Sequence, residues 1–273
     1  MGAGMAGALA REGHDVVVWN RSRDKAEALA GERVAVADSV TGAVTGADVV
    51  VTSLYDGEAV LAVADELAAA LGAEAVWLQT ATVGPDAARQ IGLTAPGRVL
   101  DAPVLGTRKP AEDGTLVVLV SGPPALLETA RPALEAIGSR TIEVGEQVGM
   151  ASALKLATNS WVGLLTVGTA QALGLARALG VEPALFLEAI AGGAVDTPYA
   201  HLKGTAMLAG GGPVSFTLDG ARKDLQLMVE AAQGAGFPDD LLTAVLGVYD
   251  RASERGHGPE DMAAVFAAFA PPA

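Results

Sequence analysis

The first twenty residues contain a helix of small side chains that leads directly into a strand. Most of residues 1–12 are Gly or Ala, Gly13 ends the helix, and residues 15–20 (DVVVWN) form an apolar run typical of a buried parallel strand. A helix followed by such a strand is the second part of a βαβ unit, whose first strand normally lies in the middle of the sheet and enters the helix through a glycine turn. We therefore expect a βαβ fold whose first strand is not encoded in these residues, because of a misassigned start codon or a trimmed coding region.

Short β-branched runs continue to alternate with Ala-rich helical stretches as far as about Ile142. The expected strands are residues 16–19, 34–37, 49–53, 75–78, 98–101, 116–121 and 141–144. Beyond Gly149 the pattern is helical, and the expected helices are residues 150–179, 183–190, 218–235 and 239–255. This order predicts an α/β fold, with a doubly wound (Rossmann) parallel sheet over residues 1–147 and an all-helical domain over residues 148–273.

The net charge and the lack of cysteine exclude several kinds of partner. The formal net charge of -14 repels nucleic-acid phosphates and anionic lipid, and the Lys and Arg residues form no cluster that reverses this locally. Without cysteine there is no disulfide or thiolate metal site, and His14, His201 and His257 lack the spacing of metal ligands. We expect a cytoplasmic protein with no nucleic-acid, membrane or metal partner.

Residues 160–176 form one uncharged stretch that raises the question of a membrane helix. The stretch is shorter than the roughly 20 residues that span a bilayer, contains Ser, Thr, Gln and Gly, and continues into Arg177. A helix buried inside a domain or at a subunit interface is the better interpretation. We therefore expect a homo-oligomer, either a dimer or a tetramer.

The strand that ends at Trp19 is followed by Asn20, Arg21 and Ser22, at the position where a dinucleotide fold meets the adenosine ribose. NAD sites place a carboxylate there, whereas a guanidinium and a hydroxyl suit a 2′-phosphate through charge-assisted hydrogen bonds. This favours NADP(H) over NAD(H). The alternative is that Asn20 and Ser22 cap the next helix while Arg21 is solvated.

Two further strand ends, residues 52–55 (TSLY) and 80–83 (TATV), fall where ligands gather at the carboxyl edge of a parallel sheet. Leu54 and Thr82 are the candidates there, with Thr82 on the nicotinamide side. Thr82 could equally cap the helix that begins near Pro85.

Residues 101–107 (DAPVLGT) describe a strand that leaves the sheet into a turn. The backbone N–H groups of Val104, Leu105 and Gly106 could hold a substrate carboxylate. A plain surface loop is the alternative.

Residues 149–159 (GMASALKLATN) carry the strongest chemical signal. Lys155 and Asn159 are one helical turn apart and point from the same face, among apolar neighbours. Apolar surroundings destabilise an ammonium and lower its pKa toward neutrality, so Lys155 is a candidate proton donor. A lysine that extends its amine to solvent beside a structural Asn159 is the alternative. From spacing alone, Lys223 is expected to form an i,i+4 surface ion pair with Asp219.

In this order and spacing, these blocks resemble the β-hydroxyacid dehydrogenase family, which comprises 3-hydroxyisobutyrate dehydrogenase and its relatives. The resemblance spans nearly the whole chain. Its matching blocks are Met1-Gly2 at the end of a glycine fingerprint, residues 19–22, residues 101–104, Lys155 with Asn159, residues 223–225 and residues 256–261. Residues 109–115 (KPAEDGT) and 19–21 (WNR) are most similar to glyoxylate/succinic semialdehyde reductases, which use NADPH.

The resemblance implies hydride transfer between NADP(H) and a small hydroxy acid, semialdehyde or keto acid. It makes Lys155 the catalytic acid, lets Asn159 position Lys155 and the substrate, and places Thr82 and Lys223 beside the nicotinamide. The remaining cofactor residues would be Met1, Gly2, Asn20, Arg21, Ser22 and Leu54. The substrate would meet Val104, Leu105 and Gly106 together with Lys155 and Asn159.

The chain departs from the family pattern at three places. Residues 105–107 (LGT) replace a Ser-Gly-Gly turn, residues 79–82 (QTAT) replace an Asp-x-Ser-Thr run, and no His-Asn pair follows Lys155 as it does in 6-phosphogluconate dehydrogenases. The substrate therefore stays open, and a sugar phosphate is disfavoured. The alternatives are an imine reductase-like enzyme, although those usually replace the lysine, or a catalytically silent NADP-binding scaffold.

Overall fold

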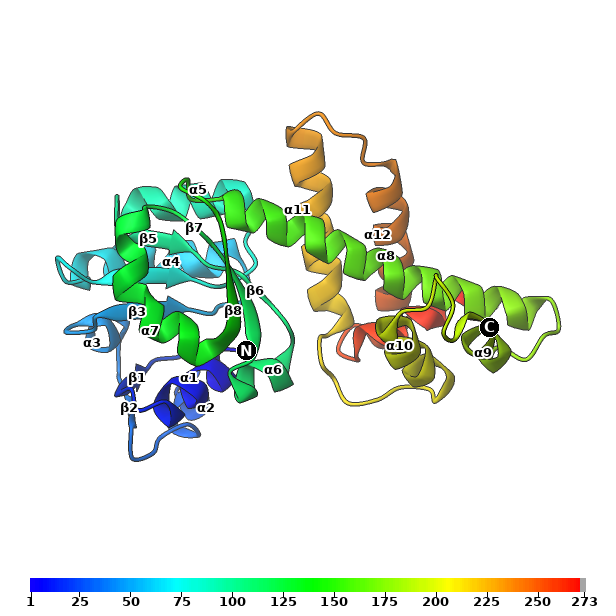
Figure 1. Cartoon of the computed structure of the whole chain (residues 1–273), viewed down its shortest axis with the longest axis horizontal. Coiled ribbons are helices and arrows are strands. Elements are labelled where there is room, and N and C mark those ends of the chain that lie inside the picture. The colour runs from blue at the N-terminus through cyan, green and yellow to red at the C-terminus, as the bar shows by residue number, and fades with distance from the viewer. Residues whose placement is uncertain (271–273) are drawn as a thin grey trace. The chain divides into compact units, whose positions relative to one another are not determined.

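The computed structural model describes residues 1–270, which form two compact units (Figure 1). The first unit covers residues 1–155 and the second begins at residue 156, whereas the sequence pattern places the boundary at 147/148. The α/β pattern is confined to the first unit, and the second is helical.

The first unit contains two groups of hydrogen-bonded strands. The strands are β1 (Val16–Val18), β2 (Val34–Val36), β3 (Val49–Thr52), β4 (Val76–Gln79), β5 (Val99–Asp101), β6 (Val104–Leu105), β7 (Leu116–Ser121) and β8 (Gly138–Gly145). Strands β1 and β2 pair in parallel as a two-stranded sheet. The other sheet has the order β3-β4-β5-β7-β6, with β8 also paired to β7. The expected Rossmann-like fold is therefore confirmed.

The sheet is not parallel throughout, and this corrects one expectation. Strand β7 runs antiparallel to both β5 and β6, while β3, β4 and β5 are mutually parallel. Only residues 106–115 separate β6 from β7. A parallel pair needs a crossover of about a dozen residues or more. A connection as short as this one therefore returns the chain antiparallel.

Helices cover both faces of the larger sheet. The helical segments of this unit are α1 (Gly2–Arg11), α2 (Arg23–Glu27), α3 (Val40–Val44), α4 (Gly57–Ala70), α5 (Pro85–Thr94), α6 (Arg108–Asp113), the 3-10 turn η1 (Pro124–Leu126) and α7 (Leu127–Ile137). Along β4, Val76 and Leu78 pack into the core under α1, α6 and α7. Trp77, between them, packs into the core under α3, α4 and α5. This alternation follows from the two-residue period of a strand and gives the doubly wound arrangement.

The second unit is built from helices. They are α8 (Met150–Ala178), which begins in the first unit, then α9 (Ala184–Ile190), α10 (Pro198–Leu208), α11 (Leu218–Gly234), α12 (Asp240–Ala252), a π turn η2 (Ser253–His257) and the 3-10 segment η3 (Met262–Phe269). The sequence pattern did not predict α10 or η3. Among residues 1–270, no helix is both long and apolar enough to cross a membrane.

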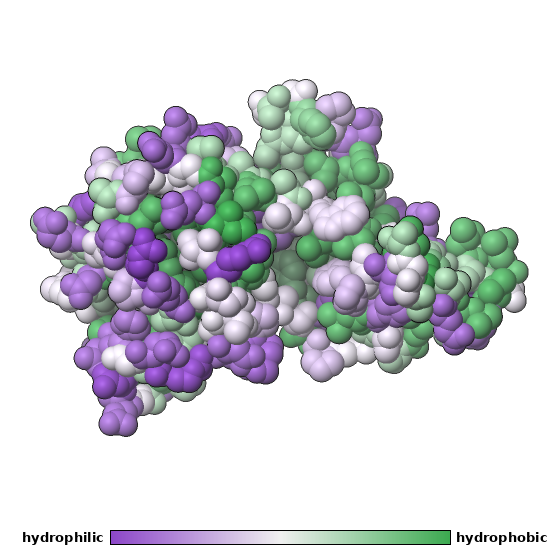
Figure 2. Space-filling model, viewed as in Figure 1, coloured by the Kyte–Doolittle hydropathy of each residue, from purple (hydrophilic) through white to green (hydrophobic). Residues whose placement is uncertain are grey.

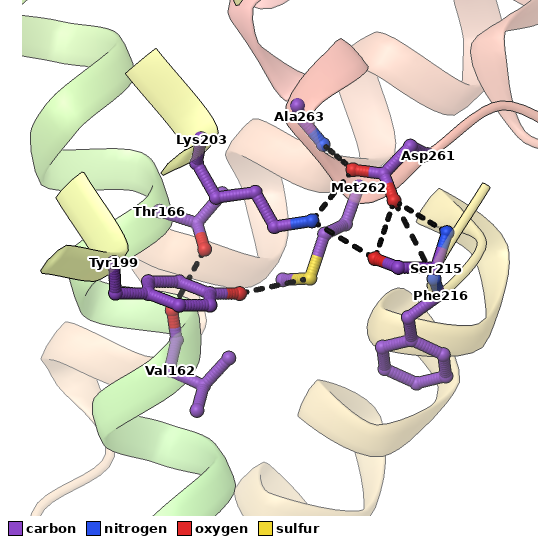
Figure 3. A network of polar contacts seen from close by, with 9 residues as sticks. All are labelled: Val162, Thr166, Tyr199, Lys203, Ser215, Phe216, Asp261, Met262 and Ala263. Atoms are coloured by element: carbon purple, nitrogen blue, oxygen red, sulfur yellow. Dashed lines mark hydrogen bonds and ion pairs between the residues drawn. The ribbon is translucent and has the colours of Figure 1, made fainter. Parts of the chain in front are cut away.

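A buried ion pair joins α10 to the segment that leads into η3 (Figure 3). Lys203 Nζ lies 2.7 Å from Asp261 Oδ1, and the two side chains are 6% and 7% exposed. The Asp261 carboxylate also accepts hydrogen bonds from the Ser215 hydroxyl (2.7 Å) and from the backbone N–H groups of Ser215 (2.9 Å) and Ala263 (3.0 Å). Burial alone raises the pKa of Asp261, but the bonds from Lys203, Ala263 and Ser215 outweigh it and hold the pKa below its ordinary value.

Candidate functional site

Three of the expected cofactor residues line one cavity of the first unit. Gly2 at the start of α1, Asn20 after β1 and Leu54 after β3 all border a space of about 1070 Å³. A β-carbon at Gly2 would lie 3.2 Å from the Ser53 β-carbon, so the first turn of α1 is tight against the end of β3. The amide-bearing, positive end of α1 therefore faces the carboxyl edge of the strands, an arrangement that suits an anionic phosphate.

Arg21 and Ser22 follow Asn20 directly and are exposed. The Asn20 side chain accepts a hydrogen bond from the Ser22 backbone N–H at 2.9 Å and so holds this turn. Ser22 occupies the N-cap position of α2, yet its hydroxyl caps no N–H group within the described chain. Its hydroxyl and the Arg21 guanidinium are both on the surface that follows β1.

Thr82 lies beyond the end of β4 and is partly buried. The N-cap of α5 is Gly84, so Thr82 is not the cap of that helix. Next to it, Gln79 makes a buried polar cluster that the sequence did not reveal. The side-chain oxygen Oε1 of Gln79 accepts from the Thr52 hydroxyl (3.1 Å) and from the Ala81 N–H (3.1 Å), and the bond to Thr52 ties the ends of β3 and β4 together.

Val104 and Leu105 form the short strand β6 and pair with β7, so the plain surface loop, which was the alternative for this segment, is wrong. The contact of Val104, Leu105 and Gly106 with substrate stays a prediction. Gly106 has φ of +125°, and a β-carbon there would lie 2.8 Å from Leu116 Cδ2. Only glycine suits this turn. Val104 is buried and Leu105 is partly buried, which leaves the bulk of Leu105 beside the turn.

The beginning of α8 is held by Asp101, a residue 0% exposed at the end of β5. Asp101 Oδ2 accepts the backbone N–H groups of Gly149 (3.1 Å) and Ser152 (2.8 Å), and Oδ1 accepts the Ser152 hydroxyl (2.7 Å). From the neighbouring strand, Ser121 Oγ accepts the Ala151 N–H (2.9 Å). Burial raises the pKa of Asp101, and the bonds from Ser152 and Gly149 oppose that rise. Sequence reasoning missed this role, because the partners are about fifty residues away.

Lys155 lies on α8 one turn after Ser152 and is 8% exposed. The spacing of Ser152, Lys155 and Asn159 places all three on one helix face. Asp101 therefore anchors the same face of α8 that carries the lysine.

Within the helical unit, Asn159 and Lys223 share one partner. Asn159 Nδ2 donates to Asp224 Oδ2 at 2.8 Å, and Lys223 Nζ lies 2.8 Å from Asp224 Oδ1. Asp224 is 4% exposed, and its role as their common partner was not predicted from the sequence. Asp219, the expected partner of Lys223, instead accepts from the Ser253 hydroxyl (2.7 Å) and pairs with Arg222 (3.4 Å).

The described residues hold no group of three or more His, Asp or Glu side chains that could bind a metal ion. The arrangement offers a phosphate-accepting helix end, a guanidinium after β1, and a buried lysine on α8. These groups suit the binding of a dinucleotide and the transfer of a proton.

Two family models match the chain. One describes the NAD binding domain of 6-phosphogluconate dehydrogenase and matches residues 1–145. The other describes the NAD-binding region of NADP-dependent 3-hydroxyisobutyrate dehydrogenase and matches residues 149–269. The first unit is therefore an NAD(P)-binding domain.

Relatives match over nearly the full length. The chain is 32% identical to glyoxylate/succinic semialdehyde reductase 2, chloroplastic, of Arabidopsis thaliana, over 98% of this chain and 76% of that protein. It is 29% identical to the cytokine-like nuclear factor N-PAC of Aedes aegypti, and spans 48% of the length of that protein. Among solved structures, a 3-hydroxyisobutyrate dehydrogenase from Mycobacterium tuberculosis with L-serine superposes with a TM-score of 0.89 at 28% identity, over 99% of this chain and 96% of that one.

Proposed function

The chain belongs to the β-hydroxyacid dehydrogenase family and is an NAD(P)-dependent dehydrogenase that acts on CH–OH groups; from this premise we propose that it prefers NADP(H) and interconverts a small hydroxy acid with its semialdehyde or keto acid. The observation that carries the proposal is the buried Lys155 on a helix whose start is tied to the sheet. The substrate class is supported by the Arabidopsis relative, which is named for glyoxylate and succinic semialdehyde.

The preference for NADP(H) rests on Arg21 and Ser22. Both are exposed at the end of β1, where the ribose of a dinucleotide lies in folds of this kind. A guanidinium binds a phosphate through two parallel charge-assisted bonds and gains nothing comparable from a ribose hydroxyl. Gly2, Asn20 and Leu54 would border the rest of the cofactor, with Met1 ahead of them and Thr82 and Lys223 toward the nicotinamide.

In the reductive direction, bound NADPH supplies a hydride to the carbonyl carbon. Lys155 donates a proton from Nζ to the oxygen that becomes the alkoxide, and in the oxidative direction it accepts that proton. Asn159 is held by its bond to Asp224 and orients the amine and the substrate oxygen. Burial of Lys155 excludes water from the proton transfer, and such positioned transfer contributes roughly 10² to 10⁴-fold to a rate. Leu105 adds bulk beside the substrate turn and so favours small substrates.

The proposal is tested with purified full-length protein, glyoxylate and succinic semialdehyde, and NADPH oxidation as the readout. Lys155→Met keeps the length and burial of the side chain and should lower kcat by about 10² to 10⁴-fold while NADPH still binds. Lys109→Met is the matched control, because that side chain is 74% exposed, and it should keep wild-type turnover. Arg21→Ala should weaken NADPH binding by on the order of 10 to 100-fold and leave NADH nearly unchanged.

Four results would contradict the proposal. Wild-type turnover in Lys155→Met removes the lysine from the reaction, and equal losses for both cofactors in Arg21→Ala remove the NADP(H) preference. NADPH binding with no reduction of either carbonyl identifies a silent binding protein, and reduction of a cyclic imine in their place identifies an imine reductase.

A further inference from the structure

Residues 80–84 connect β4 to α5 and carry Thr82, and Thr82 is the one residue among them that is not buried. The backbone N–H (3.0 Å) and the hydroxyl (2.8 Å) of Thr80 both donate to the Thr52 carbonyl, and these bonds fix the start of the segment. At the other end, Gly84 has φ of +78° and is the N-cap of α5. Thr82 is therefore the accessible residue of a segment that is anchored at both ends.

The middle of this segment is held by one side chain, that of Gln79. Gln79 Oε1 accepts the Ala81 N–H (3.1 Å), and Gln79 Nε2 donates to the Ala81 carbonyl (2.8 Å). Both backbone groups of Ala81, the residue before Thr82, are thus bonded to a single side-chain amide. Gln79 is 1% exposed, so bulk water does not compete for these two bonds. We call this pair of bonds the Gln79 clamp.

Two neighbouring side chains determine which way the Gln79 amide points. Trp77 is 0% exposed, and its Nε1–H donates to Thr52 Oγ1 (3.0 Å). An indole N–H can only donate, so the Thr52 hydroxyl accepts there and donates its own proton to Gln79 Oε1 (3.1 Å). Hydrogen-bond donation therefore runs from Trp77 through Thr52 to Gln79, and from Gln79 to the Ala81 carbonyl. This order requires a side chain at residue 79 that accepts at one atom and donates at the other.

A carboxylate would not satisfy this position in this chain. The family run has Asp where this chain has Gln79, and a carboxylate has no N–H to donate to the Ala81 carbonyl. Residue 79 also lies opposite Asp101 in the register of β4 and β5. A carboxylate there would lie beside a second buried carboxyl group, where burial and like charge both disfavour ionisation. The clamp therefore needs a neutral side chain.

The other ionisable groups of the surrounding elements do not supply a compensating charge in this register. Asp56, the N-cap of α4, is bonded to the Ala59 N–H (2.8 Å), and α8 carries Lys155 one turn after the residue that Asp101 holds. The remaining ionisable side chains of α4 and α5 are exposed, namely Glu58, Asp65, Glu66, Asp86 and Arg89. Among these groups, Asp101 is the one in strand register with residue 79.

We propose that Gln79 is a positioning residue for the dinucleotide, and that it acts by fixing Ala81 and thereby the place of Thr82. This inference rests on the proposed placement of Thr82 beside the nicotinamide. Gln79 itself is buried and acts through the backbone, whereas Thr82 meets the cofactor. Loss of the clamp lets residues 80–84 move and so weakens cofactor binding. Only a neutral side chain that both accepts and donates maintains the clamp.

The test is fluorescence titration of the full chain with NADPH and, separately, NADH, from about pH 6 to about pH 8.5, a range into which burial raises the pKa of a carboxyl at residue 79. In Gln79→Glu, the protonated carboxyl donates to the Ala81 carbonyl and accepts at its other oxygen, whereas the ionised form has no donor. The dissociation constant, relative to wild type at the same pH, should therefore rise from about 1-fold to on the order of 10-fold across this range. Gln90→Glu is the matched control, because Gln90 is exposed on α5, and its relative dissociation constant should not change with pH.

An uncharged variant tests the route through Thr82. Gln79→Met keeps the length of the side chain and removes both bonds of the clamp, so it should weaken cofactor binding by on the order of 10-fold at every pH. Thr82→Val should also weaken binding in the wild-type background, but it should add little to Gln79→Met, in which residue 82 is already displaced. A purely structural role of Gln79 would leave the two losses additive.

Wild-type affinity in Gln79→Met, or a relative dissociation constant of Gln79→Glu that does not change with pH, overturns the proposal. Additive losses in the double variant, or a lower midpoint of thermal unfolding with unchanged cofactor affinity, also refute it and assign Gln79 to stability alone. If Gln79→Glu unfolds at the higher pH, the affinity of Gln79→Met at that pH decides. Absence of carbonyl reduction by the wild type refutes the proposed reaction but leaves this comparison of cofactor affinities intact, so the two proposals fail separately.

Discussion

Removal of the Asp101 carboxylate should disconnect the start of α8 from the sheet. In Asp101→Ala, the backbone N–H groups of Gly149 and Ser152 and the Ser152 hydroxyl lose their acceptor. A buried donor left without a partner costs about 1 to 3 kcal/mol. Three such groups predict a loss of at least about 3 kcal/mol in the free energy of unfolding.

Asp101→Asn is the matched control. Its carbonyl oxygen can accept both N–H groups, and its amide can donate to Ser152 Oγ, since a hydroxyl both donates and accepts. The bonding pattern is kept and only the charge is lost. We expect the free energy of unfolding to change by no more than about 1 kcal/mol at neutral pH, because the Asp101 side chain is already removed from bulk water in the folded protein.

The assays are urea unfolding and thermal unfolding of the full chain, with turnover measured well below the unfolding transition. Asp101→Ala should lower the midpoint of thermal unfolding by at least about 6 °C, at roughly 2 °C or more per kcal/mol for a chain of this size. It should also lower kcat in the folded fraction, because Lys155 lies on the turn after Ser152. Equal stability of the Ala and Asn variants would refute the role of Asp101 as an acceptor for α8.

The pH dependence of the free energy of unfolding is a second test of Asp101. The folded-state pKa of Asp101 is raised by burial, so the folded protein binds this proton more tightly than the unfolded chain does. The stability from this proton is complete below the ordinary carboxyl pKa and is lost as pH rises through the raised value. Wild-type stability relative to Asp101→Asn should fall across that acidic window. A rise there would contradict the direction of the shift.

Two other predictions concern the helical unit. Asp261→Asn should lower the free energy of unfolding by about 3 to 5 kcal/mol at neutral pH, because it leaves the buried Lys203 charge uncompensated. This loss of stability should shrink as pH falls through the lowered pKa of Asp261. Urea unfolding of wild type and variant at neutral and acidic pH measures the loss. A loss independent of pH would contradict the role of the ion pair. Apolar side chains gather where α8 ends, including Leu179 at 71% exposure, so we expect this face to join copies of the chain (Figure 2). Light scattering should find that the wild-type chain is an oligomer and that Leu179→Glu dissociates it. The control Leu93→Glu, at a side chain 76% exposed on the other unit, should leave the oligomer intact. A monomeric wild type would contradict this expectation.

Elements with a strong local pattern were predicted closely from the sequence. The run of β-branched residues at 116–121 is β7 at those bounds, and the helix expected over 150–179 is α8 at Met150–Ala178. In both, the residues that favour the local conformation are also those that are buried, so local and tertiary preferences agree.

Elements that depend on distant partners were not predicted. Helix α10 contains Gly204, which lowers helix propensity, yet a β-carbon there would lie 3.0 Å from Leu187 Cδ2, so close packing requires the glycine. Strand β6 has two residues and exists because β7 pairs with it. Such elements are stabilised by tertiary contacts rather than by their own sequence.

The candidate site divides in the same way. The spacing of Lys155 and Asn159 was sufficient to place both on one face of a helix. The sequence did not indicate the carboxylates that hold this helix and its neighbour, Asp101 and Asp224, because each meets partners tens of residues away along the chain. Residue type and spacing identify groups that act together on one element, but not the groups that support them from another.

Asp101 and Asp261 show how the partners of a carboxylate decide the sign of its pKa shift. Both are nearly fully buried, at 0% and 6% exposure, and both accept backbone N–H and hydroxyl hydrogen bonds. Only Asp261 also meets a lysine. The Lys203 ammonium together with the Ala263 and Ser215 donors outweighs the cost of burial there, whereas the neutral donors at Asp101 do not. As pH falls in the acidic range, the helical unit therefore loses stability from Asp261 while the NAD(P)-binding unit gains it from Asp101. Acid acts on the two units with opposite sign because one buried charge has a counterion and the other has only dipoles.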